Sequence, residues 1–475
     1  MSRTVEVRPG VYHDSVTLMQ LSQTLLDDAS VVHAQVSMGT ELNLDLLVDN
    51  GYDRPDAAAG DLVIAITVAD ANGERDGSLD RVRTLADGLL AASNRRTPGA
   101  SAGVAGGNPA ARTVRTAVER GASVVLISTP GEHAFRQAID AIEAGAHPII
   151  FSDNVSVEHE VIIKQRATEA GVLAMGPDCG TVVLDGIGLG FANVVTPGPI
   201  ALVSASGTGA QQVCAIAEHG GVGIRHVLGL GGRDLTDEVG GLGALAAIRL
   251  LDADPHVELI GFVAKTIGPK TKTIVDALIA EIDTPVVTIP VEDLTAGSLA
   301  MLRAIGAAEQ ELPVWAPAAN RRRGPGRVLG LYSGGTLAAE AGHILADAGV
   351  EADVIDLGDD EYTRGRPHPM IDSRLRVERL VEAGRSAGVA SGAADDATDD
   401  LGAVLLDVVL GHGAAADPAA DLVPALAEIP VPVYVALIGT SDDPQGRDAQ
   451  ARALADAGAS VFLSNAAAVR AAVGP

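Results

Sequence analysis

Lysine, aromatic residues and cysteine are all scarce in this chain of 475 residues. Four of its 34 basic residues are lysines, and aromatic residues make up 2% of the sequence. The two cysteines, Cys179 and Cys214, are too few for a disulfide framework and lack the spacing of a metal site. A formal net charge of −28 disfavours nucleic acid as a partner, because phosphate backbones are bound by basic surfaces.

Long apolar runs are also missing, so the sequence predicts no membrane-spanning segment, and the N-terminus lacks the pattern of a secretion signal. We therefore expect a cytoplasmic protein without a membrane partner. Alanine, valine, leucine and glycine are abundant instead, and such slim side chains suit close packing of helices on sheets. The length predicts three or four domains rather than one core.

Alternating strand and helix patterns divide the chain into four units, all of α/β or α+β character. We expect an α+β unit over residues 1–95, compatible with a ferredoxin-like order, and open-sheet α/β units over 110–195, 196–310 and 326–475. Residues 172–175 are predicted to be the last strand of the first open sheet. Two stretches rich in small and polar residues, 92–112 and 384–400, are predicted to be a linker and a surface loop.

A turn of small and hydroxylated residues, 204–209, follows an apolar strand and precedes a helical segment. Backbone N–H groups at such a helix N-terminus attract phosphate or carboxylate. A tight turn with an ordinary N-cap would have the same sequence. The turn is repeated at 333–336, again directly after a strand, which suggests that two such turns share one ligand. The candidate anion-binding residues are Ser204, Ser206, Gly207, Thr208, Ser333, Gly334, Gly335 and Thr336.

Several cationic side chains follow the carboxyl ends of predicted strands, where open parallel sheets bind their ligands. Lys265 belongs to a small lysine cluster at 264–272, which is unusual in so acidic a chain. A solvated loop would explain this cluster equally well. The loop at 356–369 contains arginines suited to carboxylate or phosphate, and the alternative is an ordered surface loop with local ion pairs. The candidate substrate-binding residues are Arg233, Lys265, Arg364, Arg366 and His368.

Several common motifs are absent. The chain has no P-loop, no well-formed dinucleotide fingerprint, no His-Glu-x-x-His and no nucleophile elbow. Ser204, Ser206 and Ser333 are therefore interpreted as anion-holding hydroxyls rather than nucleophiles. The sequence predicts no metal site and no certain cofactor.

Six short motifs together resemble one family. They are MGPDCGT (175–181), VSASGTG (203–209), GLGGRDL (229–235), IDLGDD (355–360), GRPHPMID (365–372) and LLDVV (405–409). The first three are similar to the α-subunit of succinyl-CoA synthetase, and the whole set resembles the FdrA family of acyl-CoA-synthetase-like proteins. The resemblance covers essentially the whole chain. It implies an N-terminal FdrA-specific unit, a CoA-binding-type Rossmann domain and two flavodoxin-like succinyl-CoA-ligase domains.

In the synthetases, two helix N-termini point at a phosphorylated histidine. The resemblance places the matching turns at 204–208 and at 411–414, so Gly411, His412 and Gly413 join the candidate anion site, ahead of the turn at 333–336. From the residues alone, His412 could bind an anion or cap a turn. The stretch that matches the histidine loop, 290–298, contains no histidine, and the chain has no ATP-grasp segment.

The FdrA resemblance implies carbamoyl transfer between oxalurate, phosphate, oxamate and carbamoyl phosphate, in an oligomer with separate partner subunits. Phosphate or an acyl phosphate would then be the ligand, and CoA binding stays open. Two other functions also remain open. One is an ADP-forming acyl-CoA synthetase, and the other is a non-catalytic subunit that binds a small metabolite.

Overall fold

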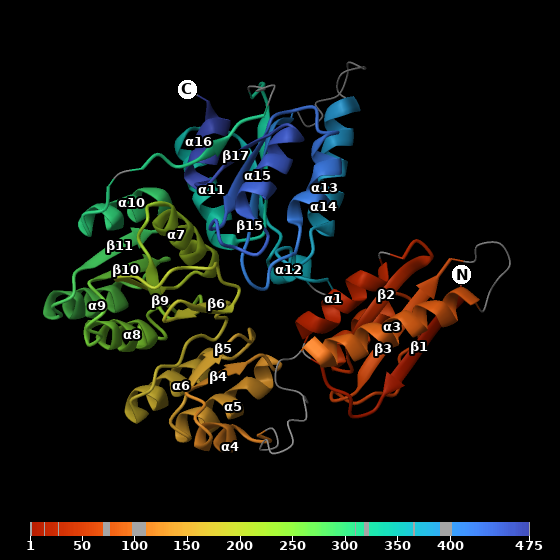
Figure 1. Ribbon diagram of the computed structural model, residues 1–475, viewed down its shortest axis with the longest axis horizontal. Coiled ribbons are helices and arrows are strands. Elements are labelled where there is room, and N and C mark those ends of the chain that lie inside the picture. The colour runs from red at the N-terminus through yellow and green to blue at the C-terminus, as the bar shows by residue number, and fades with distance from the viewer. Residues whose placement is uncertain are drawn as a thin grey trace. The chain divides into compact units, whose positions relative to one another are not determined.

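The computed structural model describes residues 2–13, 15–26, 28–69, 77–96, 111–308, 310–317, 323–363, 366–389 and 401–474. Their contacts group them into two compact units (Figure 1). One unit comprises Met1–Arg112 and Asp360–Asp372, and the other comprises Thr113–Asp359 and Ser373–Pro475. Within the described ranges, no helix is both long enough and apolar enough to cross a membrane.

The first unit contains an antiparallel sheet with the strand order β1-β3-β2. All seven residues of the central strand are buried, because α1 and α3 cover one face of the sheet while α2 and Tyr52 cover the other. This explains why all of its residues except Thr67 are apolar. The elements are β1 (Ser2–Arg8), α1 (Ser15–Leu26), β2 (Val31–Met38), α2 (Glu41–Asp49), β3 (Leu62–Val68), α3 (Gly77–Arg96) and α12 (Asp360–Thr363).

The second unit begins with a small Rossmann-like layer in which β4 and β5 pair in parallel. The predicted strand at 172–175 forms only a single bridge between Met175 and Ile149. The chain turns away directly afterwards at Gly176, whose φ is +89°, and Pro177 has no N–H for a ladder. The elements are α4 (Val114–Glu119), β4 (Val124–Ile127), α5 (Gly131–Glu143), β5 (His147–Ile150) and α6 (Val157–Ala170).

The next sheet has the order β11-β10-β8-β9-β6-β7. Its strands β8 to β11 are parallel, and an antiparallel hairpin, β6–β7, extends it beyond β9. Residues 181–190 therefore join this sheet and not the preceding layer, so the sheet begins before the expected boundary at 195. The elements are β6 (Thr181–Leu184), β7 (Ile187–Gly190), β8 (Ile200–Ser204), α7 (Gly207–His219), β9 (Ile224–Gly229), α8 (Leu242–Asp252), β10 (Leu259–Ala264), α9 (Pro269–Glu281), β11 (Val286–Pro290) and α10 (Leu294–Ala304).

The last sheet has the order β12-β17-β16-β15-β13-β14, with β12 antiparallel and the other strands parallel. Strand β12 lies between the two expected units 196–310 and 326–475, in residues that neither unit includes. The elements are β12 (Val314–Trp315), β13 (Arg327–Tyr332), α11 (Gly335–Asp347), β14 (Ala352–Asp356), α13 (Arg374–Val389), β15 (Leu401–Val409), α14 (Pro418–Leu426), β16 (Val433–Ile438), α15 (Arg447–Asp456), β17 (Ala459–Phe462) and α16 (Asn465–Val473).

Both large sheets place their first parallel strand between the second and the third. The runs β9-β8-β10-β11 and β14-β13-β15-β16-β17 follow the flavodoxin-like order, as we expected. In this order the ligand crevice lies at the carboxyl ends of the first and third strands, here β8 with β10 and β13 with β15. The predicted linker at 92–112 and surface loop at 384–400 are wrong at their first residues, since 92–96 end α3 and 384–389 end α13. Residues 97–110 and 390–400 lie outside the described residues.

A buried charge cluster joins the Rossmann-like layer to the first large sheet. Lys164 of α6, itself buried, donates to Glu160 Oε1 at 2.8 Å, to Asp234 Oδ1 at 2.7 Å and to Leu230 O at 3.0 Å. Asp234 also accepts the backbone N–H groups of Gly243 and Ala244 at the start of α8. The lysine is thus fully coordinated, as a buried charge requires.

We expect Lys164→Met to lower the free energy of unfolding by about 3–5 kcal/mol, because Glu160 and Asp234 would remain as buried carboxylates without their cation. Lys272→Met is the control, since Lys272 forms an exposed i,i+4 pair with Asp276. Urea unfolding followed by circular dichroism measures both changes. Equal midpoints for the two variants would contradict this account of the cluster.

Candidate functional site

The N-termini of α7 and α11, which follow the first strands of the two large sheets, meet each other. Ser206 is the N-cap of α7; its hydroxyl accepts a hydrogen bond from Gly209 N at 2.9 Å and donates to Thr336 Oγ1 at 2.6 Å. Both side chains are buried. The expectation that the Gly411 turn is the closer partner of this helix N-terminus is therefore wrong. The turn that we ranked second, at 333–336, is the one in contact.

The contact is reciprocal. A Cβ on Gly334, the N-cap of α11, would lie 2.7 Å from Thr208 Oγ1. Thr208 and Thr336 are each the second residue of their helix, so the N-cap of each helix meets the threonine of the other. This is the pattern of an isologous interface, here formed within one chain. Only glycine at 334 allows the two helices to approach this closely.

The sixth residues of α7 and α11 extend this pattern. Gln212 Oε1 accepts the N–H of Asn465 at the start of α16, and Glu340 Oε1 accepts the N–H of Leu294 at the start of α10. Each helix therefore caps the last helix of the other sheet. Glu340 Oε2 also accepts from Asn465 Nδ2 at 2.8 Å, and burial raises the pKa of this carboxyl to about 7. Sequence reasoning missed Glu340, whose position in an amphipathic helix carries no signal of its role.

Two of the predicted anion-holding hydroxyls are occupied by the protein itself. Ser204 Oγ donates to Ser206 O at 2.7 Å and accepts from Ser206 N, which fixes the turn after β8. Ser206 Oγ serves the cap and the bond to Thr336, as described above. We correct the prediction accordingly, because these serines build the turn and do not offer a free hydroxyl to a ligand.

The turn before α11 does bind an anion, and it is the carboxylate of Asp407. Ser333 N, Ser333 Oγ and Gly334 N donate to the Asp407 carboxylate at 2.8–3.0 Å. Arg376 Nη1 lies 3.4 Å from Asp407 Oδ1, and both side chains are buried. Burial raises the pKa of Asp407, while Arg376 and the Ser333 donors lower it. The sequence feature that could have predicted this contact is the aspartate within the apolar strand LLDVV.

Donors without a partner remain on both helices. Among the described residues, the N–H groups of Gly207 and Thr208, and those of Gly335 and Thr336, have no hydrogen-bond acceptor. Lys265, directly after β10, likewise makes no ion pair there. Its charge reaches Asp356 at the end of β14, since it lowers the pKa of that carboxyl. These groups converge at the carboxyl ends of β8, β10, β13 and β14.

The Gly411–Gly413 turn has a different environment. His412 N donates to Ala192 O at 2.8 Å, and a Cβ on Gly411 would lie 2.4 Å from the same oxygen. The next helix, α14, starts only at Pro418 and is capped by Asp417. The turn packs against residues 190–193 and does not begin a helix, so the prediction that it forms one half of the paired-helix site is wrong.

The remaining cationic candidates lie elsewhere. Arg233 is bound to Glu160, with its Nη2 2.9 Å from Oε2, and it donates to Val155 O, so it belongs to the buried charge cluster around Lys164. Arg366 and His368 lie in the other compact unit, with Met1–Arg112. Arg364 lies outside the described residues. Of these candidates the structure brings Lys265 alone to the paired helices.

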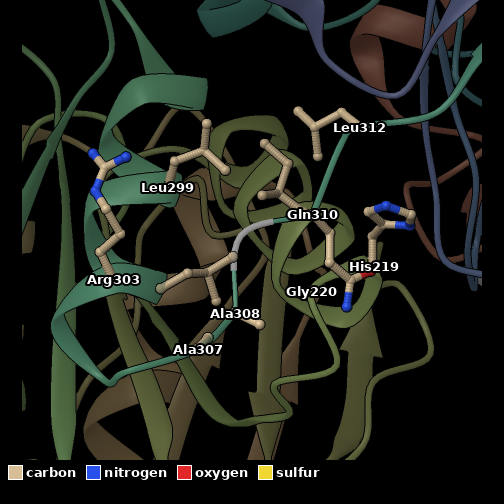
Figure 2. Close-up of a pocket in the computed structure, with 10 residues that line it drawn as sticks. His219, Gly220, Leu299, Arg303, Ala307, Ala308, Gln310 and Leu312 are labelled. Carbon is tan, nitrogen blue, oxygen red and sulfur yellow. The ribbon is translucent and has the colours of Figure 1, made fainter.

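A shallow hollow lies at the opposite ends of α7 and α10 (Figure 2). It encloses about 300 Å³, including space open to solvent. His219 and Gly220 border it on the α7 side, and Leu299 and Arg303 on the α10 side. Because α7 has 13 residues, the hollow is roughly 20 Å from the helix N-terminus. It is separate from the paired-helix site.

Comparisons with known proteins match two separate stretches of the chain to family models. Residues 331–473 match the CoA-ligase family model, and residues 1–104 match the model of the AllF heavy metal-associated domain. The protein YahF of Escherichia coli K12 is 29% identical over 96% of this chain and 95% of its own. The α-subunit 2 of the ADP-forming succinate–CoA ligase of Archaeoglobus fulgidus is 28% identical over 40% of this chain and 67% of its own.

Over 40% of its length the chain is thus similar to an α-subunit of succinate–CoA ligase, and its residues 331–473 and 1–104 are similar to the CoA-ligase and AllF-domain models. Among solved structures it is similar to the dinucleotide-forming acetyl-coenzyme A synthetase 1 of Ca. Korarchaeum cryptofilum. That match has 14% identity and a TM-score of 0.28, and covers 74% of this chain and 84% of the other.

The N-terminal match raises the question of a metal. Residues 1–104 contain no cysteine, so the soft thiolate ligands typical of heavy-metal sites are missing there. Within the described ranges, no group of three histidine, cysteine or acidic residues could hold a metal ion. Cys179 and Cys214 are buried in the other unit, and burial raises the pKa of Cys179 to about 12. These residues do not fit a heavy-metal site.

We expect Gly334→Ala to weaken the contact between α7 and α11, because its Cβ would clash with Thr208. The cost should be about 1–3 kcal/mol of unfolding free energy. Gly342→Ala is the matched control on the same helix; nothing lies within 4 Å of its Cβ, and alanine is the better helix former. It should stabilise by about 0.5–1 kcal/mol. A Gly334→Ala chain as stable as wild type would refute the close approach.

Glu340 should make stability depend on pH. Its folded pKa of about 7 lies above the ordinary value of 4.5, so the folded state binds more protons between these values. Stability from this group is therefore greatest below pH 4.5 and is lost as the pH rises through 7, by on the order of 3 kcal/mol. Thermal unfolding of wild type and Glu340→Gln from pH 5 to 8 tests this. Parallel curves for the two chains would show that Glu340 does not titrate in this range.

Proposed function

We propose that the protein handles a small acyl or carbamoyl phosphate at the paired N-termini of α7 and α11. The observation that carries this proposal is the set of unpartnered donors described above: four backbone N–H groups and the ammonium of Lys265. Helix N-termini favour anions because their orphan N–H groups and their dipoles act together. Phosphoryl oxygens are the acceptors that such a group of donors fits.

The charge around these donors favours a phosphate on the α7 side. Asp407 is compensated by Arg376 and by three donors, so its charge is largely neutralised where it lies. The pKa of Asp356 is raised, chiefly by burial, while the charge of Lys265 acts in the opposite direction. Lys265, one of four lysines in the chain, then supplies a positive charge.

The FdrA-like motifs suggest the reaction. Oxalurate and phosphate would give oxamate and carbamoyl phosphate. Phosphate would be held as the nucleophile, and the donors would stabilise the charge that develops on the carbamoyl oxygen. This chemistry needs neither a phosphohistidine nor a nucleotide, in keeping with the lack of histidine at 290–298. Separate partner subunits would complete the enzyme.

The second candidate is an acid–thiol ligase acting through an acyl phosphate. The similarity to α-subunits of succinate–CoA ligase and malate–CoA ligase favours it, since these relatives match over 37–40% of this chain. In this case the same donors would hold the phosphoryl group, and CoA would be the acceptor. ATP-dependent and CoA-dependent thioester formation distinguishes this candidate from the first.

The test is phosphate-dependent consumption of oxalurate by the purified chain, alone and with candidate partner chains encoded beside it. We expect carbamoyl phosphate as product. Calorimetric titration with inorganic phosphate should show Lys265→Met binding at least tenfold more weakly than wild type, about 1.4 kcal/mol.

Lys270→Met is the control, because it removes the same charge five residues away on the exposed start of α9. Equal losses of phosphate affinity in both variants would mean that general charge, and not Lys265, governs binding. If no preparation forms carbamoyl phosphate, the carbamoyl reaction is wrong. Thioester formation in the same preparations would then support the ligase.

A further inference from the structure

Asp356 is a carboxylate with one free oxygen beside the paired helices. It is the last residue of β14 and pairs with Tyr332, the last residue of β13. Its Oδ1 accepts Gly358 N at 2.9 Å, and its Oδ2 would lie 2.4 Å from a Cβ on Gly335. Among the described residues, Oδ2 has no hydrogen-bond partner. The missing side chain at Gly335 thus leaves this oxygen exposed at the first residue of α11.

The charges that face Asp356 come from three elements. Asp407 of β15 and Asp359 of the following loop raise its pKa, and Lys265 after β10 lowers it. Burial is the largest influence and also raises the pKa. The carboxyl therefore holds a proton more readily than an exposed aspartate, while a cation stays near enough to stabilise the deprotonated form.

The distance to the donors of α7 suits a small substrate. Asp356 Oδ2 and Thr208 Oγ1 each lie close to one of two adjacent α-carbons, those of Gly335 and Gly334. Since adjacent α-carbons are 3.8 Å apart, the two oxygens are within roughly 12 Å of each other. This upper limit places both groups within reach of one small substrate.

We infer that Asp356 is the general acid–base residue of this site, an assignment that rests on the proposed carbamoyl transfer. A phosphate oxygen attacks the carbamoyl carbon of oxalurate, and the C–N bond to oxamate breaks. The Asp356 carboxyl gives its proton to the departing amide nitrogen. The carboxylate then takes up the proton that the phosphate hydroxyl loses as carbamoyl phosphate forms. Atoms and charge balance without another reactant.

Asp356→Asn tests this role, because asparagine keeps the acceptor for Gly358 N but cannot donate the proton in the same way. We expect kcat for oxalurate phosphorolysis to fall by about 10²–10⁴, the usual contribution of general acid–base catalysis. Binding of carbamoyl phosphate, measured by calorimetry, should stay within threefold of wild type. Asp353→Asn is the control on the same strand; its side chain is exposed and pairs with Arg327.

The pH profile gives a second readout. In wild type, kcat/KM should fall at high pH as the Asp356 carboxyl loses its proton, and Asp356→Asn should lack this falling limb. Turnover of Asp356→Asn within threefold of wild type, or loss of carbamoyl phosphate binding, would overturn the assignment. If Asp356→Asn does not fold, a wild-type pH profile of kcat/KM without the falling limb overturns the assignment. Wild type that forms no carbamoyl phosphate instead refutes the proposed function.

Discussion

The hydrogen bond from Ser206 to Thr336 is the contact on which the rest of the site depends. It joins the first turns of α7 and α11, which follow the first strands of two sheets. A buried hydroxyl pair must satisfy both partners, so the bond fixes the two helices in one register. The glycine at 334, which lets Thr208 approach, makes this register possible. The free donors of both helices then lie together.

The two helix N-termini are similar in sequence but differ in what they hold. The turn before α11 is filled by the Asp407 carboxylate, whereas the turn before α7 is closed by the hydroxyl of its own Ser204. Both helices keep free N–H donors, and the α11 side adds the carboxyl groups of Asp407 and Asp356. The proposed transfer of a carbamoyl group to phosphate uses both, the donors for the phosphate and a carboxyl group for the proton.

Most of the strands could be predicted from the sequence, because parallel strands buried on both faces are continuous apolar runs. The ranges 200–203 and 259–264, which lie in β8 and β10, are examples. The turns that meet could not be predicted, because the pairing of Ser206 with Thr336 depends on how two sheets pack. Sequence similarity pointed instead to Gly411. The roles of Asp356 and Glu340 were missed for the same reason, since both arise from residues distant in the chain.

The reciprocal contact has a consequence for how the site stays assembled. Ser206 and Thr336 are 130 residues apart in a single polypeptide, so their encounter is intramolecular. When two such halves are on separate chains, diluting the protein separates them. Here the tether keeps each half at a high effective concentration near the other, on the order of millimolar for flexible connections. The paired helices should therefore remain assembled at any dilution at which the chain itself stays folded.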